Sequence, residues 1–426
     1  MFEGVLVIAS TLGIVAARLT LGVVLVGVQF CVFKAGSRVL SGLGAEFSLG
    51  RKLRPLAFGF FVLVNIPLGI FLAESFLAPR LVIIYSPPIR LESLIRPISY
   101  LFFVWTIGSV LFVIASPILM GLLALIQFSE RRRERGRADG LVKAVDLSRR
   151  RFVQLFLAGV ATVPFAISAY GAVAAKKGQT VEMVEVPIRG LPDALDGVRI
   201  VQLSDIHAGL FMSANQIGEW ARIANSLEAD LIALTGDFVT TRTSEVSVFM
   251  KGVSGLRARY GVFGCLGNHD IGLEEVIDRE FTKAGFVLLR NRNQYVDVRG
   301  AKLNLVGVDF IESHPPPGRR LFDLLQRIPL EGPTVLLCHN PNNFHDAARA
   351  GINLMLSGHF HGGQIALKIG DVLIATARLA TMFVAGLFKI GDSHLYVNRG
   401  LGTTGPPIRI NAPPEITVIT LRTATS

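Results

Sequence analysis

Cysteine is scarce in this sequence. Three cysteines, at positions 31, 265 and 338, occur among 426 residues. An odd and sparse set does not form a disulfide framework, which excludes a small disulfide-stabilised scaffold. Cys265 and Cys338 each precede a candidate functional residue, and we expect both to be small buried strand residues. A disulfide between neighbouring strand ends is the alternative.

Internal repeats and low-complexity linkers are also missing, and so is any basic excess in the second part of the chain. Residues 178–426 carry 23 Lys and Arg against 24 Asp and Glu, whereas residues 1–177 carry 20 against 8. The formal net charge of +11 therefore belongs to the first part. Because the second part has no basic surplus to hold a polyanion, we expect no nucleic-acid partner.

Long apolar runs account for the first part. Hydrophobic residues make up 51% of the chain, and the mean hydropathy is +0.50. The apolar runs cover about residues 4–33, 56–78, 98–128 and 152–175. Each is long enough to cross a bilayer, which needs about 20 residues. We therefore predict a transmembrane region of four helices over residues 1–177, followed by a separate domain over residues 178–426.

Basic residues between these runs predict the orientation of the chain. Loop 34–54 carries five, loop 79–97 carries three, and segment 130–151 carries nine. The positive-inside rule then places the first and third loops in the cytoplasm. We accordingly expect a multi-pass protein of the inner cell membrane whose domain 178–426 lies on the extracytoplasmic side.

The segment Ser148–Gln154 resembles the twin-arginine export signal, with Val153 and Gln154 in place of the usual Leu and Lys. Ala172–Ala174 fits a signal-peptidase site, so cleavage after Ala174 is one possibility. The alternative is that these arginines only precede an ordinary membrane helix. Both interpretations put the following domain outside.

Polar side chains follow five apolar, strand-like runs of the second part. The runs cover residues 198–203, 231–234, 261–266, 334–338 and 353–357, and the residues that follow them are Asp205, His207, Asp237, Asn268, His269, Asp270, His339, His359 and His361. Helical patterns at 214–227 and 244–256 alternate with the strands, which indicates an α/β fold. Ligands bind at the carboxyl ends of strands in such folds, so we expect these side chains to meet at one edge.

The residue types indicate a metal centre. Asp, Asn and His without Cys suit Mn, Fe or Zn. Seven ligands are too many for one ion and fit two divalent ions that share a carboxylate. Such a pair polarises a phosphoryl group and generates a hydroxide nucleophile. His269 is placed to protonate the leaving oxygen. The chemistry predicted is metal-assisted hydrolysis of a phosphoester.

The ordered motifs Asp-x-His, Gly-Asp, Gly-Asn-His-Asp, a lone His and Gly-His-x-His resemble those of the calcineurin-like metallophosphoesterases, over about residues 180–426. The resemblance implies a four-layer αββα sandwich. It also implies a first ion on Asp205, His207 and His361, a second on Asn268, His339 and His359, and Asp237 as the bridge.

For the remaining two residues the resemblance implies that His269 is the acid or contacts the phosphate, with Asp270 orienting it. A helix cap for residues 271–284 is the alternative for Asp270. Gly362-Gly363-Gln364 and Asn398–Gly402 are similar to a narrower branch of membrane-anchored or exported phosphodiesterases, the YkuE and YaeI type.

We therefore predict a phosphodiesterase. If the apolar run Leu379–Phe388 is exposed beside the site, it would contact the membrane and favour a lipid or cell-envelope substrate. The alternative is that this run is a buried strand. A different class of function is an inactive metal-binding scaffold or regulatory domain of a membrane protein. Loss of activity usually removes a ligand or the acid, and here none is missing.

Overall fold

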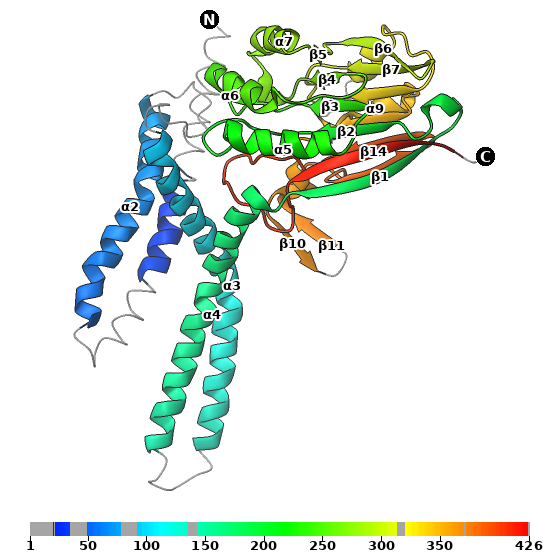
Figure 1. Ribbon diagram of the computed structural model, residues 1–426. Helices are drawn as coiled ribbons and strands as arrows, with labels where there is room; N and C mark the ends of the chain where they lie inside the picture. The colour runs from blue at the N-terminus through cyan, green and yellow to red at the C-terminus, as the bar shows by residue number, and fades with distance from the viewer. Residues whose placement is uncertain are drawn as a thin grey trace, which may run out of the picture. The chain divides into compact units, whose positions relative to one another are not determined.

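The computed structural model (Figure 1) describes residues 20, 22–34, 49–77, 92–134, 143–312, 320–369 and 372–424. The chain forms two compact units, Met1–Ala172 and Val173–Ser426. The beginning of the apolar run 4–33 lies outside the described residues.

The first unit is helical. Its helices are Gly22–Lys34, α2 (Leu49–Leu77), α3 (Glu92–Glu134) and α4 (Lys143–Lys177), the last of which continues into the second unit. α2, α3 and α4 each begin several residues before the start predicted from the apolar runs, at 56, 98 and 152. The reason is that helical hydrogen bonding also includes the polar, arginine-containing residues before each run.

Among the described residues, two helical stretches are long and apolar enough to cross a membrane, Arg96–Ile118 and Gly159–Lys177. The helices Gly22–Lys34 and Pro55–Gly69 are apolar but shorter.

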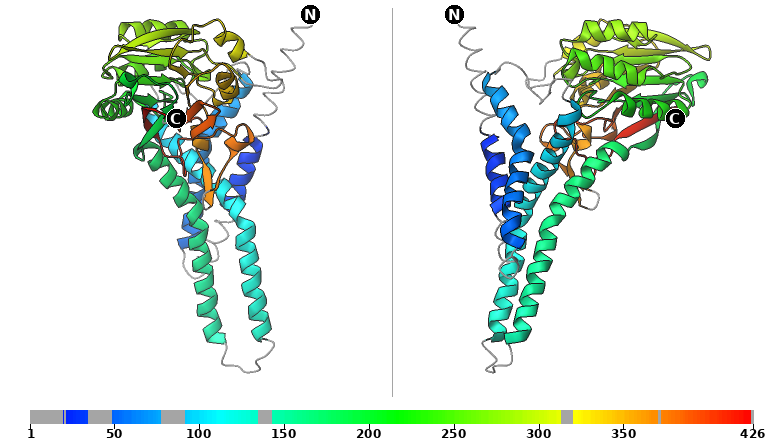
Figure 2. Two further views of the ribbon diagram at one scale, coloured as in Figure 1. Left: turned by 90° about the vertical axis from the view of Figure 1, so that its right-hand side faces the viewer. Right: turned by 60° about the vertical axis from the view of Figure 1, so that its left-hand side comes forward.

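Aromatic contacts hold the helices of this unit together. The rings of Phe60 and Trp105 lie 5.7 Å apart, and those of Trp105 and Phe165 lie 5.1 Å apart, so α2, α3 and α4 meet at Trp105. A buried hydrogen bond of 3.0 Å runs from Gln29 Nε2 to Thr106 Oγ1. Both views of Figure 2 show α3 and the first part of α4 running side by side.

The second unit contains two six-stranded mixed sheets, with orders β1-β14-β2-β3-β4-β5 and β12-β13-β9-β8-β7-β6. The strands of the first sheet are β1 (Thr180–Ile188), β2 (Arg199–Leu203), β3 (Leu231–Thr235), β4 (Val262–Cys265), β5 (Val287–Leu288) and β14 (Glu415–Thr423). Those of the second are β6 (Arg292–Val298), β7 (Ala301–Gly307), β8 (Thr334–Leu337), β9 (Leu354–Ser357), β12 (Gly386–Ile390) and β13 (Ser393–Val397).

Within each sheet the strands that lead to the candidate residues are parallel neighbours, β2, β3 and β4 in one and β8 and β9 in the other. Antiparallel pairs occur at β14–β2, β12–β13 and β6–β7.

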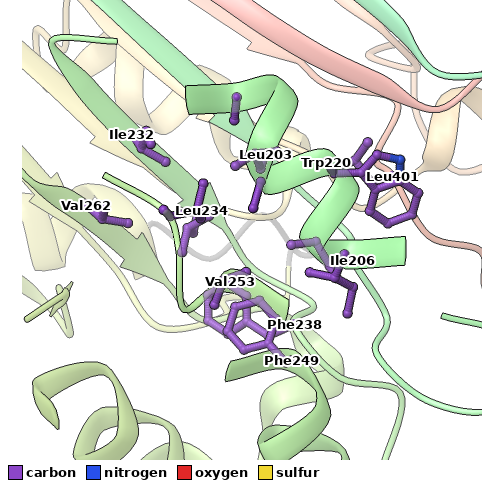
Figure 3. Packing of buried hydrophobic residues seen from close by; sticks show 14 of the residues in the cluster. Leu203, Ile206, Trp220, Ile232, Leu234, Phe238, Phe249, Val253, Val262 and Leu401 are labelled. Atoms are coloured by element: carbon purple, nitrogen blue, oxygen red, sulfur yellow. The ribbon is translucent and has the colours of Figure 1, made fainter. Parts of the chain in front are cut away.

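Three hydrophobic clusters define four layers. Ile200, Phe263, Leu337 and Leu356 belong to the cluster that joins the two sheets. On the outer face of the first sheet, a second cluster packs α5 (Ala214–Ser226), α6 (Thr243–Val253) and α7 (Glu274–Lys283), and Figure 3 shows Trp220 and Phe249 within it. A third cluster packs α8 (Arg320–Leu325) and α9 (Phe344–Arg349) on the second sheet. The unit is thus the α/β sandwich that the sequence predicts.

A short hairpin, β10 (Ala366–Ile369) and β11 (Val372–Ala375), projects from this unit (Figure 1). Leu367 and Ile374 are cross-strand partners, and both side chains are exposed. The run Leu379–Phe388 that follows is neither wholly exposed nor wholly a buried strand. Leu379 and Met382 are 93% and 67% exposed, whereas Phe383 is buried at 6%. Cys265 and Cys338 are buried and free, so no disulfide joins them.

Candidate metal centre

The five loops that carry the candidate residues follow β2, β3, β4, β8 and β9. The strands belong to two facing sheets, so the residues meet at one rim of the sandwich, where strand ends of both sheets come together. A buried amide links the sheets beneath them. Gln202 of β2 donates 2.9 Å hydrogen bonds to Thr235 Oγ1 of β3 and to the Ser357 carbonyl of β9. This bridge fixes the spacing at the floor of the site.

Asp205, His207 and His361 form one cluster. The Nε2 atoms of the two histidines lie 3.1 Å apart, and His361 Nε2 lies 3.4 Å from Asp205 Oδ1. All three residues are buried, although they come from loops more than 150 positions apart. Their ligand atoms lie close enough together to bind one cation.

Asn268, His339 and His359 form the second cluster. Asn268 Oδ1 lies 2.9 Å from His359 Nδ1. His339 Nδ1 faces the Thr235 carbonyl at 2.7 Å, which turns its Nε2 toward Asp237 Oδ2 at 3.2 Å. The structure thus brings the seven predicted ligands together, and it also groups His207 and Asp237 with His269. The division of these ligands between two ions stays a prediction.

Asp237 lies between the two clusters. Its Oδ1 accepts a 2.9 Å hydrogen bond from the backbone N–H of His269. Its Oδ2 lies 3.5 Å from His207 Nε2 and 3.2 Å from His339 Nε2. One oxygen thus fixes the carboxylate, and the other faces a histidine of each cluster.

Glycine is required where the loops approach one another. A Cβ on Gly358 would overlap the Asp205 carboxylate, and one on Gly236 would come within 2.7 Å of His339 Nδ1. Gly236 and Gly358, which directly precede Asp237 and His359, therefore leave the space in which the clusters assemble.

The backbone around the centre is strained. Among the described residues, Asp205, Asp237, His359 and His361 have φ values between 50° and 77°, and His207 has 48°. Non-glycine residues adopt this left-handed region at a cost of about 1–3 kcal/mol each, and such strain concentrates at functional sites. Five of the seven predicted ligands share it, which favours a functional role over ordinary packing.

His269 stands at the rim. Its Nδ1 donates to the Thr240 carbonyl at 2.6 Å, and its ring meets the His207 ring edge-on at 4.7 Å. The Glu245 carboxylate accepts hydrogen bonds of 2.8–3.0 Å from the N–H groups of Thr240, Thr241 and Arg242. Glu245 therefore holds the loop that orients His269.

Asp270 does not orient His269, contrary to the sequence-based expectation. Its carboxylate accepts hydrogen bonds from Gly267 N–H at 2.8 Å and Phe238 N–H at 2.9 Å. It is also not the cap of α7, because that helix begins at Glu274 with Leu273 as its N-cap. The short turn Asn268–Asp270 directs Asp270 inward, where it joins the loops after β3 and β4.

The ion-free centre holds its protons unevenly. Burial raises the pKa of Asp205 to about 6, and it lowers the pKa of His207 to about 3 and that of His359 to about 4. Burial also acts to lower the pKa of His339, but the carboxylates of Asp237 and Asp205 outweigh it and raise that pKa to about 10. A proton on His339 thus partly compensates the buried carboxylates.

Several buried atoms in this centre have no hydrogen-bond partner among the described residues. They include Asp205 Oδ2 and His207 Nδ1. Buried polar atoms are normally satisfied, so unpaired polar atoms among these side chains are consistent with an absent cation. Together with the Asp, Asn and His donor set, they fit divalent metal ions.

Comparison with known proteins agrees with this geometry. Residues 198–363 match the family model for the calcineurin-like phosphoesterases. The uncharacterized metallophosphoesterase YkuE of Bacillus subtilis is 32% identical over 289 residues, which cover 65% of this chain and 98% of that protein. This chain belongs to the calcineurin-like phosphoesterases.

Two further relatives define the neighbourhood within the calcineurin-like family. A bovine transmembrane protein with a metallophosphoesterase domain is 31% identical over 303 residues, 68% of this chain and 67% of the relative. Phosphodiesterase YaeI of Escherichia coli is 29% identical over 283 residues, 65% of this chain and 99% of the relative. As a family member this chain is a hydrolase of phosphoester bonds, with a possible metal site.

Sequence reasoning missed two residues of this calcineurin-like site. Arg409 is 1% exposed, and its guanidinium donates to the carbonyls of Gly402, Ala412 and His361 and contacts His361 Nδ1 at 3.2 Å. Thr404 Oγ1 lies 3.0 Å from both His207 Nε2 and His361 Nε2.

Both missed residues lie in the irregular segment after β13, where neither periodicity nor a motif marks them. The only signal was the glycine-rich stretch Asn398–Gly402. Its backbone is joined to the Asp205 loop by hydrogen bonds from Leu401 N–H and Gly402 N–H.

Proposed function

We propose that this chain is a membrane-anchored phosphodiesterase that uses two divalent ions, Mn, Fe or Zn, bound at the candidate metal centre. The first ion would be held by Asp205, His207 and His361, and the second by Asn268, His339 and His359, with Asp237 shared. The observation that carries this proposal is the position of Asp237 Oδ2, within 3.5 Å of a histidine from each cluster.

When bound, the ions would supply a hydroxide nucleophile at neutral pH and polarise the phosphoryl group. His269 would donate a proton to the leaving oxygen from Nε2, because its Nδ1 is engaged by the Thr240 carbonyl. Glu245 would keep that carbonyl in place through the loop amides that it binds. Asp270 would act on the loops alone, as a positioning residue.

Hydrolysis of a chromogenic phosphodiester by the full-length protein in detergent with added Mn²⁺ tests this function. We expect His269→Ala to lower kcat by about 10²–10⁴-fold, the usual contribution of a general acid. His345→Ala is the matched control, since His345 is exposed on α9. An inactive but ion-binding wild-type protein would instead support the scaffold alternative.

For the first part of the chain we propose four membrane-crossing helices over residues 1–177 and an extracytoplasmic domain over residues 178–426. The loop charges support this orientation. α4 ends at Lys177 and β1 begins at Thr180, so the domain starts within about 10 Å of the helix end. Protease added to intact spheroplasts should degrade the domain, whereas protection until lysis would reverse the orientation.

We propose further that the substrate is a lipid-linked or cell-envelope phosphodiester. The hairpin β10–β11 begins two residues after Gln364 and exposes Leu367 and Ile374, and Leu379 and Met382 are exposed just beyond it. Apolar side chains on this surface can enter the headgroup region of a bilayer.

Replacing Leu379 and Met382 by Ser tests the lipid contact without touching the core, whereas Phe383 packs against Phe344 and Phe388 and is unsuitable. We expect a fall of at least about tenfold in turnover of vesicle-borne substrate, because each exposed apolar side chain adds to membrane affinity. Turnover of a water-soluble phosphodiester should not change. If the variant hydrolyses the vesicle-borne substrate as fast as the wild type does, this surface has no role in substrate binding.

A further inference from the structure

The hydroxyl of Thr404 lies beside the two histidines of the first cluster. Thr404 Oγ1 is 3.0 Å from His207 Nε2 and 3.0 Å from His361 Nε2, and the two nitrogens are 3.1 Å apart. The three atoms thus form a nearly equilateral triangle. Atoms that bind one metal ion at about 2.0–2.2 Å lie roughly 3.0–3.4 Å from one another, so the triangle has the spacing of adjacent ligands.

Hydrogen bonding alone accounts poorly for this triangle. A threonine hydroxyl can donate its proton to one ring nitrogen and accept a proton from the other, which accounts for two of the three contacts. The third contact, the 3.1 Å approach of the two Nε2 atoms, is then left without a proton of its own. A cation shared by three lone pairs satisfies all of them. A hydroxyl oxygen is also a hard donor, in keeping with the carboxylates of Asp205 and Asp237 and with the ions that such donors prefer.

A second contact shows that the position of Thr404 is built into the fold. The side-chain amide of Gln364 accepts a 2.9 Å hydrogen bond from Thr404 N–H and donates one of 3.1 Å to the Thr404 carbonyl. It donates another of 2.8 Å to the Pro406 carbonyl. Gln364 has a φ of 50°, so this clamp is held at the cost of backbone strain. The Gly-Gly-Gln that follows His361 therefore acts on the Thr404 loop.

We propose that Thr404 is a ligand of the first metal ion, bound through Oγ1 and positioned by Gln364. This inference rests on the proposed dinuclear centre and extends its first site by a neutral oxygen. A neutral ligand occupies a coordination position without adding charge. It therefore leaves fewer positions for solvent at the first ion than the sequence motifs imply.

The test titrates the ion-free full-length protein, in detergent, with Co²⁺ while heat and visible absorption are recorded. Thr404→Val removes the hydroxyl and keeps the shape, and Thr404→Ser restores the hydroxyl. Thr403→Val is the matched control, because Thr403 is 5% exposed and its Oγ1 has no hydrogen-bond partner among the described residues. Thermal unfolding of each variant reports on folding.

We expect Thr404→Val to weaken one of the two binding events by at least about tenfold, the lower limit for loss of a group that supports a metal. The other event provides an internal reference and should not change. Thr404→Ser should bind as the wild type does, and the Co²⁺ absorption of Thr404→Val should intensify as the coordination number falls.

Wild-type affinity and an unchanged Co²⁺ spectrum in Thr404→Val would overturn the role of Thr404 while leaving the dinuclear centre intact. The role of Thr404 would also be overturned if Thr404→Val and Thr403→Val weakened both Co²⁺-binding events to the same degree. Such a result would reflect a general loosening of the loop. A wild-type protein that binds no Co²⁺ would remove the proposed centre itself, and this inference with it.

Discussion

The two units of this chain bury polar groups in opposite ways. In the described part of the helical unit the buried polar residues are neutral, namely Gln29, Ser99, Thr106, Ser109 and Ser168. In the described part of the second unit, by contrast, Asp205, Asp237, His207, His339 and His361 are buried, and their ligand atoms lie close together. Charges inside an apolar environment are costly and are retained where they function. The comparison therefore assigns the chemistry to the second unit.

The sharpest way to break this comparison is to remove the shared carboxylate. Asp237→Asn would place an amide where Oδ2 now faces His207 and His339. We expect kcat/KM for a phosphodiester to fall on the order of 10³-fold, because the charge that the two proposed ions would share is lost. The measurement is steady-state hydrolysis together with elemental analysis. Asp392→Asn, at an exposed ion pair, is the control, and retention of both ions with normal turnover would contradict the shared role.

The buried charge also predicts a pH dependence of metal binding. In the ion-free protein the pKa of His339 is raised to about 10, so at neutral pH its proton must leave before an ion can bind. Affinity should then rise about tenfold per pH unit, because metal ligands bind in their deprotonated forms. Below about pH 6, where burial keeps Asp205 protonated, a second proton must leave and the dependence should steepen.

Competition with a chelator of known affinity, at constant ionic strength, measures this slope. The pKa values of His339 and Asp205 are both raised, so the ion-free protein holds protons that a bound ion must displace. Metal affinity therefore increases as the pH rises. An affinity that does not change between about pH 7 and pH 9 would show that His339 is neutral before binding.

A third test addresses Arg409, the buried cation of the second unit. Arg409→Met would leave the carbonyls of Gly402, Ala412 and His361 without their donor. Each lost partner costs at least about 1 kcal/mol, so we expect about 3 kcal/mol of destabilisation and a Tm lower by about 6–12 °C. Arg422→Met is the control, because that guanidinium pairs with Glu185 at the surface, where water screens the pair, and its loss should lower Tm much less. Equal Tm values for both variants would refute the structural role.

The strand ends of the second unit could be predicted because each motif follows a short apolar run, and the structure ends these strands within two residues of the predictions. What could not be predicted depends on tertiary contact. Arg409 meets His361 across 48 positions from an irregular segment, and no periodicity marks it. Asp270 adjoins His269 in sequence, yet the turn that holds them sends the two side chains to different partners.

In the helical unit the positions of the helices could be predicted, but their ends could not. Its apolar runs predict helices, and the structure contains helices there. Hydropathy does not define where such helices end, because arginine-rich flanks such as residues 131–134 continue the helical backbone of α3. The number of membrane crossings stays a prediction, since the apolar helical stretches Gly22–Lys34 and Pro55–Gly69 are, within the described residues, shorter than a full span.

The smallest effect is expected for a substitution in the helical unit, which tests whether the two units differ in their role in catalysis. Gln29→Leu removes the 3.0 Å hydrogen bond to Thr106. Polar contacts between membrane helices contribute about 0.6 kcal/mol on average, so unfolding in detergent should shift only slightly. Since none of the proposed ligands is changed, kcat/KM for a soluble phosphodiester should stay within about twofold, and Thr106→Val should behave alike. A tenfold loss of turnover requires a rise of about 1.4 kcal/mol in the activation free energy of hydrolysis. A local contact between two helices cannot supply that much. Such a loss in either variant would therefore mean that helix packing controls the metal centre.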